Sequence, residues 1–281
     1  MIAAEEFAQQ GSNAQLSLAY ELQDGRSVLT RREHYGPLLV QKPFYPEGDA
    51  VCHTILVHPP GGIVAGDRLR VNLIVAADAH ALVTTPGATK WYRSEGAFAD
   101  QHVKVKLADG ARLEWLPQEA IVFNRAQARQ TISVDLTGDA CYLGWDILML
   151  GRTAAQEKFS EGIYQQVWQV TRDGVPLWLE RGQLNGASSL MAAPAGLAGC
   201  SVTATLIAVG NAWNAALVGA CRAIPAGGDA RVAVTALPQV LSVRYLGHRV
   251  EDAKRYLQSV WRELRPHYFG RMVQTPRIWS T

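Results

Sequence analysis

Alternation of apolar and polar residues with a period of two is the feature that most restricts the fold of this chain. In DRLRVNLIV (67–75), four aliphatic residues fall on one face, and Arg68, Arg70 and Asn72 fall on the other. This pattern is typical of a strand with one buried face. QHVKVKL (101–107) repeats it, and the turn dipeptide Asp109–Gly110 follows, so we expect 101–116 to form a hairpin.

The same signals recur towards the C-terminus. Segment 165–182 predicts a second hairpin that turns at Asp173–Gly174, and 231–237 and 239–246 predict two further strands. Helical spacing of apolar residues is clear over 249–265, where Pro266 is expected to help end the helix. A weaker helix is predicted over 211–222, with Asn211 as its N-cap.

These elements predict a mainly β protein with a small two-helix element near the C-terminus. We expect a single domain over 1–281, with a β body of about 14–208 and 229–246 and helices of about 211–222 and 249–265. No Pro/Ser-rich linker or change in composition divides the chain.

Composition argues against several function classes. The formal net charge is only +2 over 281 residues, which gives no global support for nucleic-acid binding. No run of about 18 apolar residues is present, and 1–15 does not resemble a signal peptide. The four cysteines are scattered without a CxxC spacing. We therefore expect a cytoplasmic protein with reduced thiols and no membrane association.

The loop HPPGGIVAGD (58–67) resembles a phosphate cradle but lacks its chemistry. No lysine follows the glycines, a strand rather than a helix comes next, and Asp67 would repel phosphate. The loop is instead predicted to be a tight connection between strands, in which proline fixes φ and glycine permits φ above zero.

No motif marks a catalytic or metal centre. His53 and His58 point to opposite faces of an extended strand, and the other histidines are isolated, so each is expected to be a surface or hydrogen-bonded structural residue. GxSxG is absent, although a triad dispersed along the chain stays open. An uncharacterised hydrolase is therefore kept as an alternative to a non-enzymatic role.

Three acids stand out because of their apolar surroundings. Asp67 closes the glycine loop, Asp146 lies within LGWDILMLG, and Glu180 ends VPLWLE. Buried acids need a partner, so a structural ion pair with Arg68, Arg152 or Arg181 is the simpler interpretation. Glu114 and Glu119 are weaker cases of the same kind.

Two segments mix aromatic and basic residues as protein interfaces do: 90–94, with Trp91 and Tyr92, and 265–281, with Arg277 and Trp279. We expect these four residues to contact a partner, with ordinary packing as the competing interpretation. A carbohydrate-binding β module that uses Trp91 and Tyr92 as platforms is a third possible function.

Taken together, seven segments resemble one family, the urease accessory protein UreD, also called UreH. They are KPFYPEG (42–48), HPPGGIVAGDRL (58–69), TTPGATKWYRS (84–94), LEWLPQEAIVF (113–123), GWDILMLGR (144–152), PLWLERG (176–182) and PRIWST (276–281). They occur in the family order over nearly the whole chain. Two positions depart from the family pattern: Asn124 replaces an acid, and Gln156 replaces a glycine.

The resemblance implies a β-helix-like fold and a non-catalytic role in urease maturation. It implies binding to apo-urease and to UreF, contact with the GTPase UreG through UreF, and delivery of nickel, with no tightly bound cofactor and only transient Ni²⁺. It also implies an internal water-filled tunnel. We expect Asp67, Asp146 and Glu180 to line this passage, with Thr89 as a neutral contributor, because oxygen donors hold Ni²⁺ less tightly than His or Cys clusters.

Overall fold

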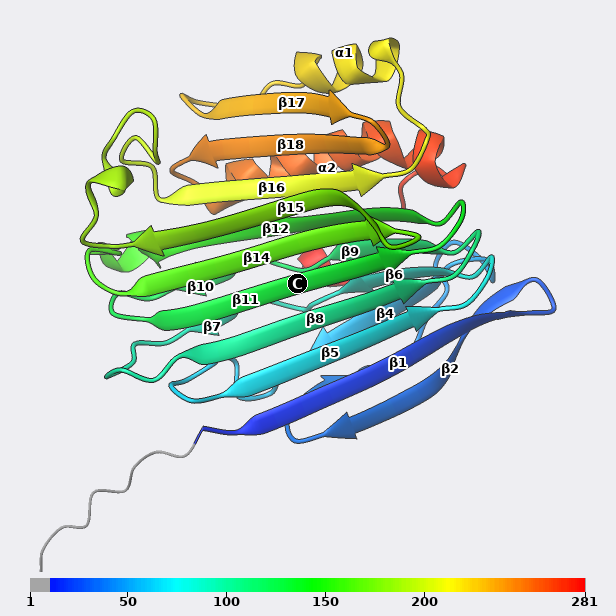
Figure 1. Cartoon of the computed structure of the whole chain (residues 1–281), viewed down its shortest axis with the longest axis horizontal. Helices are drawn as coiled ribbons and strands as arrows, with labels where there is room; N and C mark the ends of the chain where they lie inside the picture. The colour runs from blue at the N-terminus through cyan, green and yellow to red at the C-terminus, as the bar shows by residue number, and fades with distance from the viewer. Residues whose placement is uncertain (1–10, 281) are drawn as a thin grey trace, which may run out of the picture.

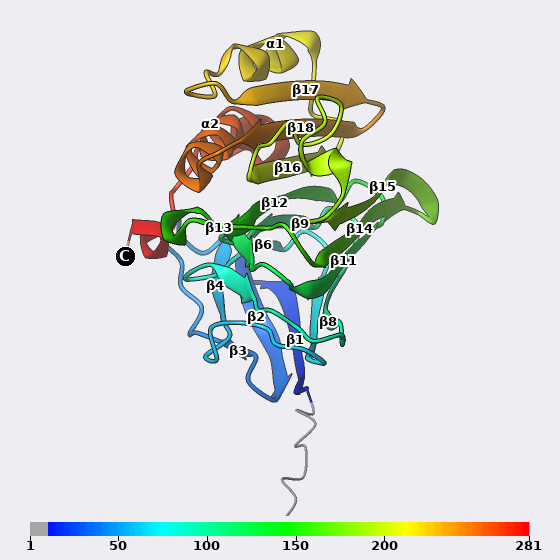
Figure 2. The same ribbon diagram turned by 90° about the vertical axis from the view of Figure 1, so that its left-hand side faces the viewer.

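Two β-sheets face each other in the computed structural model, which describes residues 11–280, and both helices lie at one end (Figures 1 and 2). The first sheet has seven strands. In spatial order they are β15 (Val175–Asn185), β14 (Ile163–Arg172), β11 (Gln127–Leu136), β8 (Ala99–Leu107), β5 (Arg68–Val75), β1 (Asn13–Gln23) and β2 (Arg26–Tyr35).

The second sheet has eleven strands. Its main order is β17 (Arg231–Leu237), β18 (Val240–Gly247), β16 (Val202–Val209), β12 (Cys141–Arg152), β9 (Arg112–Leu116), β6 (His80–Thr84), β4 (Cys52–Val57) and β3 (Leu39–Val40). The short strands β7 (Thr89–Trp91), β10 (Ala120–Val122) and β13 (Glu157–Lys158) branch from this path.

Apart from the short strands β7, β10 and β13, successive strands alternate between the two sheets through the middle of the chain. β4, β6, β9 and β12 pair in parallel in the second sheet, while β5, β8, β11 and β14 pair in parallel in the first. The chain therefore coils, and each coil adds one strand to each sheet. This confirms the mainly β, β-helix-like fold that the sequence and its family resemblance predict.

The hairpin expected over 101–116 is wrong. β8 and β9 belong to different sheets, and the turn at Asp109–Gly110, where Gly110 has φ +69°, carries the chain from one sheet to the other. Each strand instead pairs with parallel neighbours, as Val103 does with Val71 and Ile132. The predicted hairpin at Asp173–Gly174 is present as β14–β15, and the two C-terminal strands pair as β17–β18.

Apolar side chains form two cores. One fills the space between the sheets, and the other lies between the second sheet and the helices. β12 contributes to both: Tyr142, Leu148 and Leu150 face the first core, whereas Leu143 and Trp145 face the second. Because both faces of β12 are covered, apolar residues occupy both of its faces instead of alternating with polar ones, and Asp146 is the exception within the strand. By alternation, Asp146 lies on the face between the sheets.

The helices are α1 (Ala215–Ala223) and α2 (Val250–Phe269), and three short 3₁₀ turns span Thr153–Ala155, Ser189–Met191 and Arg277–Ser280. The side chain of Asn214, not Asn211, caps α1 by accepting a hydrogen bond from Leu217 N. Helix α2 continues through Pro266 and ends where Gly270 adopts φ +65°. Within residues 11–280, neither helix has the length and apolar character needed to cross a membrane.

Candidate functional site: a polar cavity between the sheets

Asp146 occupies the centre of a polar cluster between the two sheets. It comes from β12 and is only 7% exposed. Gln166 of β14 donates a hydrogen bond from Nε2 to Asp146 Oδ2 (2.8 Å) and another to Gln130 Oε1 (2.9 Å). Gln130 of β11 lies 3.4 Å from Asp146 Oδ1 and accepts a hydrogen bond from the Tyr164 hydroxyl (2.7 Å). Two side chains of the first sheet thus contact one acid of the second, and Tyr164 supports one of them.

Burial of this cluster disfavours the ionised carboxylate without abolishing it near neutral pH. Burial raises the pKa of Asp146 to about 6, although the hydrogen bonds from Gln166 and Gln130 act in the opposite direction. Burial also raises the pKa of Tyr164 far above its ordinary value. No basic side chain pairs with Asp146 among the described residues, so the ion pair that its apolar setting suggested is not formed.

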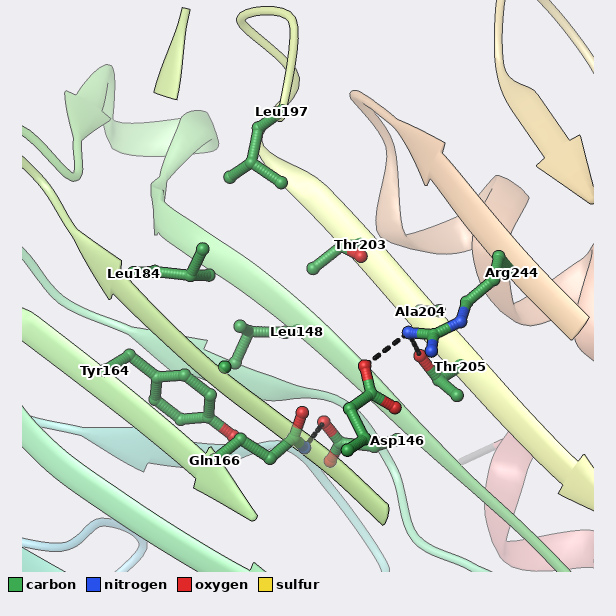
Figure 3. Close-up of a pocket in the computed structure, with 12 residues that line it drawn as sticks. Asp146, Leu148, Tyr164, Gln166, Leu184, Leu197, Thr203, Ala204, Thr205 and Arg244 are labelled. Carbon is green, nitrogen blue, oxygen red and sulfur yellow. Dashed lines mark hydrogen bonds and ion pairs between the residues drawn. The ribbon is translucent and has the colours of Figure 1, made fainter. Parts of the chain in front are cut away.

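A cavity of about 130 Å³ opens on one side of Asp146 (Figure 3). Its lining includes Glu180 of β15 and Arg244 of β18, which form an ion pair, and Arg244 also donates to the Thr205 hydroxyl (3.0 Å). Glu180 is therefore in an ion pair, but with Arg244 in place of the partners that sequence proximity suggested. Its second oxygen, Oε2, is buried and has no hydrogen-bond partner among the described residues.

A second cavity, of about 60 Å³, lies on the other side of the same acid. Its polar lining includes Thr89, His58, Gln101 and Gln118, as well as Gln130 and Asp146. His58 Nε2 is buried without a hydrogen-bond partner in residues 11–280. Because Asp146 lines both cavities, the Asp146–Gln130–Gln166 cluster forms the wall between them. Asp146, Glu180 and Thr89 therefore line two neighbouring cavities, which we call the polar interior after these side chains, although apolar residues complete both linings.

Asp67 has a different place in the structure. Its Oδ1 accepts hydrogen bonds from the backbone N–H (2.6 Å) and hydroxyl (3.0 Å) of Ser12, and its Oδ2 accepts one from Val64 N (2.9 Å). The carboxylate thus closes the glycine loop on itself and ties it to the start of β1. Asp67 does not line either cavity. It still lies close enough to His58 to oppose the lowering of that histidine's pKa by burial.

The four residues that were expected to contact a partner differ in how far they are exposed. Trp91 is 1% exposed and packs edge-on against Tyr164, so its ring is part of the core and does not present a platform. Tyr92 is half-buried against Phe123, and Trp279 is half-buried against Trp145 and Trp261. Arg277 is exposed.

Sequence reasoning missed the most buried charges of the molecule. Glu114 and Arg265 are both fully buried and form an ion pair. In the sequence, Glu114 stands out only as a weaker case of a buried acid, and Arg265 is only the last residue of the predicted helix 249–265. The one available signal was the acid within the apolar strand LEWL. Its partner is 151 residues away and could not be identified from spacing.

The described residues lack a cluster of typical metal ligands. Within residues 11–280, no group of three or more His, Cys, Asp or Glu side chains could hold a metal ion. The polar interior instead offers single carboxylates, amides and hydroxyls. Such a lining supports weak, exchangeable contacts with a hydrated cation, because hard oxygen donors bind late transition metals less tightly than nitrogen and sulfur donors do.

A sequence model of the UreD urease accessory protein family matches residues 12–280. The chain belongs to the UreD family. A relative named urease accessory protein UreD from Dechloromonas aromatica (strain RCB) is 47% identical over 272 residues, covering 96% of this chain and 94% of the relative. Its counterpart from Azoarcus sp. (strain BH72) is 46% identical over 275 residues, covering 98% and 96%.

The two departures from the UreD pattern both lie beside one turn. Asn124 Oδ1 accepts hydrogen bonds from the backbone N–H groups of Ser160 and Glu161, both 2.9 Å, so a neutral amide oxygen serves as the acceptor there. Gln156 adopts φ +56°, in the left-handed region that favours glycine. Gln156 therefore holds, with local strain, a conformation that glycine adopts freely.

Proposed function

We propose that this chain is a non-catalytic chaperone of urease maturation that binds apo-urease and UreF and engages the GTPase UreG through UreF. Membership in the UreD family supports this role, and relatives that carry the name of a urease accessory protein cover almost the whole chain. The cytoplasm is the compartment in which such a complex would form.

We further propose that the polar interior around Asp146 is a passage for Ni²⁺. The observation that carries this proposal is that Asp146 lines both cavities, which hold about 130 Å³ and 60 Å³. Volumes of this size accommodate several waters. Buried polar atoms without a partner, Glu180 Oε2 and His58 Nε2, supply further places for water or an ion.

The balance of charge suits transit better than storage. Asp146 and Glu180 attract a divalent cation, while Arg244 beside Glu180 offsets one of the two carboxylates. The interior then attracts the ion without binding it tightly. Asp67 does not line the proposed passage, because its oxygens accept hydrogen bonds from Ser12 and Val64.

The test is the double variant Asp146→Asn/Glu180→Gln, co-expressed with the urease subunits and the other accessory proteins. We expect pull-down of UreF and apo-urease to be unchanged and the nickel content of purified urease to fall. Glu21→Gln/Asp24→Asn changes two exposed acids of the β1–β2 hairpin and is the matched control. Unchanged nickel content would overturn the passage, and failure of the parent chain to capture apo-urease would overturn the scaffold role.

A further inference from the structure

A cysteine and a histidine from distant parts of the chain face each other beside the polar interior. Cys200 precedes β16 and His248 follows β18. These strands are antiparallel, and the ladder pairs Val202 with Gly247. The pairing continues beyond the ladder, because the Ser201 hydroxyl donates to the His248 carbonyl (3.3 Å). As a result, Cys200 Sγ lies 3.7 Å from His248 Nε2.

The pair lies on a cavity of about 370 Å³ and is open to solvent. His248 is exposed and Cys200 is half-buried, so an incoming ion reaches both. Met191 lines the same cavity. A thiol and an imidazole form a soft to borderline pair of donors, which selects late transition metals over Mg²⁺ and Ca²⁺.

The separation of the two donor atoms matches that of two ligands on one ion. With metal–sulfur and metal–nitrogen bonds of about 2.3 Å and 2.0–2.1 Å, tetrahedral ligands lie about 3.6 Å apart. The observed 3.7 Å between Cys200 Sγ and His248 Nε2 therefore requires no backbone movement. Two protein ligands leave the remaining coordination positions to water or to a partner, so the ion would exchange readily.

This cavity adjoins the polar interior along β12 and β16. Leu150 and Ser201 line the first, while Leu148 and Thr203, two residues along each strand and on the same sheet face, line the second. Two residues of a strand span about 7 Å. Figure 3 shows Leu148, Leu197 and Thr203 at the end of the polar cavity that lies away from Arg244.

We propose that Cys200 and His248 bind a late divalent transition-metal ion at a loading site beside the polar interior. That the ion is Ni²⁺ and that it enters at this site both rest on the proposed function. Metal binding by Cys200 and His248 does not, because it depends only on donor atoms of this chain.

The test uses the untagged full chain under a thiol-sparing reductant, with Co²⁺ as a spectroscopic probe and Ni²⁺ in calorimetry. We expect a thiolate-to-cobalt charge-transfer band that Mg²⁺ does not abolish and Ni²⁺ does. Cys200→Ser should remove the band, and Cys200→Ser or His248→Gln should each weaken Ni²⁺ binding by about tenfold or more. Cys141→Ser and His102→Gln, which change another half-buried cysteine and another exposed histidine, are the controls.

Absence of the band from the parent chain, its persistence in Cys200→Ser, or equal weakening by the controls would each overturn the site. The Asp146→Asn/Glu180→Gln variant separates this inference from the passage, since it should keep the band. If this variant keeps the band and urease made with it has normal nickel content, only the passage is overturned. If the parent chain lacks the band and urease made with the variant has reduced nickel content, only the loading site is overturned.

Discussion

Arg265 of α2 donates from Nε to both carboxylate oxygens of Glu114 in β9, at 3.1 and 2.9 Å, although neither side chain has exposed surface. The pair does not stand alone. Trp261 Nε1 donates to Glu114 (2.6 Å), His80 Nε2 lies 2.9 Å from it, and Arg265 also contacts Glu47. This network fixes α2 against the outer face of the second sheet (Figure 2).

Breaking this pair should destabilise the chain strongly. Arg265→Met leaves Glu114 and Glu47 without their shared cation, and we expect it to lower the free energy of unfolding by about 3–5 kcal/mol. Glu114→Gln should cost less, because Arg265 keeps Glu47 as a partner. The loss of unfolding free energy in the double variant should be smaller than the sum of the losses in the two single variants, because Arg265 and Glu114 interact directly. Urea denaturation measures these values. Arg262→Met, at an exposed position of the same helix, should stay within about 0.5 kcal/mol of the parent.

Acid should weaken the same network over a defined range of pH. Burial would raise the pKa of Glu114, but the hydrogen bond from His80 and the charge of Arg265 outweigh it and lower that pKa to about 2. The ionised carboxylate therefore stabilises the fold above pH 4.5, and this contribution, about 3 kcal/mol, is lost as pH falls from 4.5 towards 2. Tryptophan fluorescence during acid unfolding measures the slope, which should be flatter in Glu114→Gln. An equal slope in both proteins would contradict the assignment.

Asp146 should show the opposite dependence. Its pKa is raised to about 6 from 3.8, so the folded state holds a proton that the unfolded state has released. Stability should then fall by about 3 kcal/mol as pH rises from 3.8 through 6. Asp146→Asn cannot ionise, so its stability relative to the parent should increase over this range. Paired urea titrations at pH 4 and pH 8 check this, and a difference that does not change with pH would contradict it.

The alternating strands were predictable because their signals are local. The inward face of β5, with Leu69, Val71, Leu73 and Val75 buried, follows the pattern of its own residues. The route between sheets was not predictable in this way. A turn such as Asp109–Gly110 has the same composition whether the next strand pairs with the previous one or crosses to the other sheet. Here only the resemblance to UreD supplied the coiled arrangement.

The candidate site was predictable to a similar extent. Asp146 stands out as an acid in an apolar strand, and Glu180 as an acid at the end of one. Gln130 and Gln166, which contact Asp146, do not stand out in the sequence, because they come from alternating strands of ordinary composition. Asp67 stands out for the same reason as Asp146, yet its partners are the N–H groups of Ser12 and Val64. An apolar setting therefore marks a buried acid without revealing whether it faces a cavity or closes a turn.

Gly62 should be intolerant of a side chain. A Cβ at this position would lie 2.2 Å from the Tyr92 ring, which itself packs edge-on against Phe123. We expect Gly62→Ala to lower the free energy of unfolding by about 1–3 kcal/mol, and Tyr92→Ala in the same chain to remove most of that added penalty. Gly87→Ala is the control, since nothing lies within 4 Å of its added Cβ. Equal effects at the two glycines in chemical denaturation would contradict the packing argument.

Arg277 and Trp279 should separate partner contact from folding at the C-terminus. Trp279 donates from Nε1 to the Thr84 hydroxyl (2.8 Å) and packs against Trp145 and Trp261, so Trp279→Ala should cost about 2 kcal/mol of stability. Arg277 is exposed, and Arg277→Ala should leave stability within about 0.5 kcal/mol of the parent. If this segment contacts a partner, Arg277→Ala should still reduce capture of UreF or apo-urease in pull-down. Full capture by Arg277→Ala, together with reduced stability of Trp279→Ala, would assign the segment to folding alone.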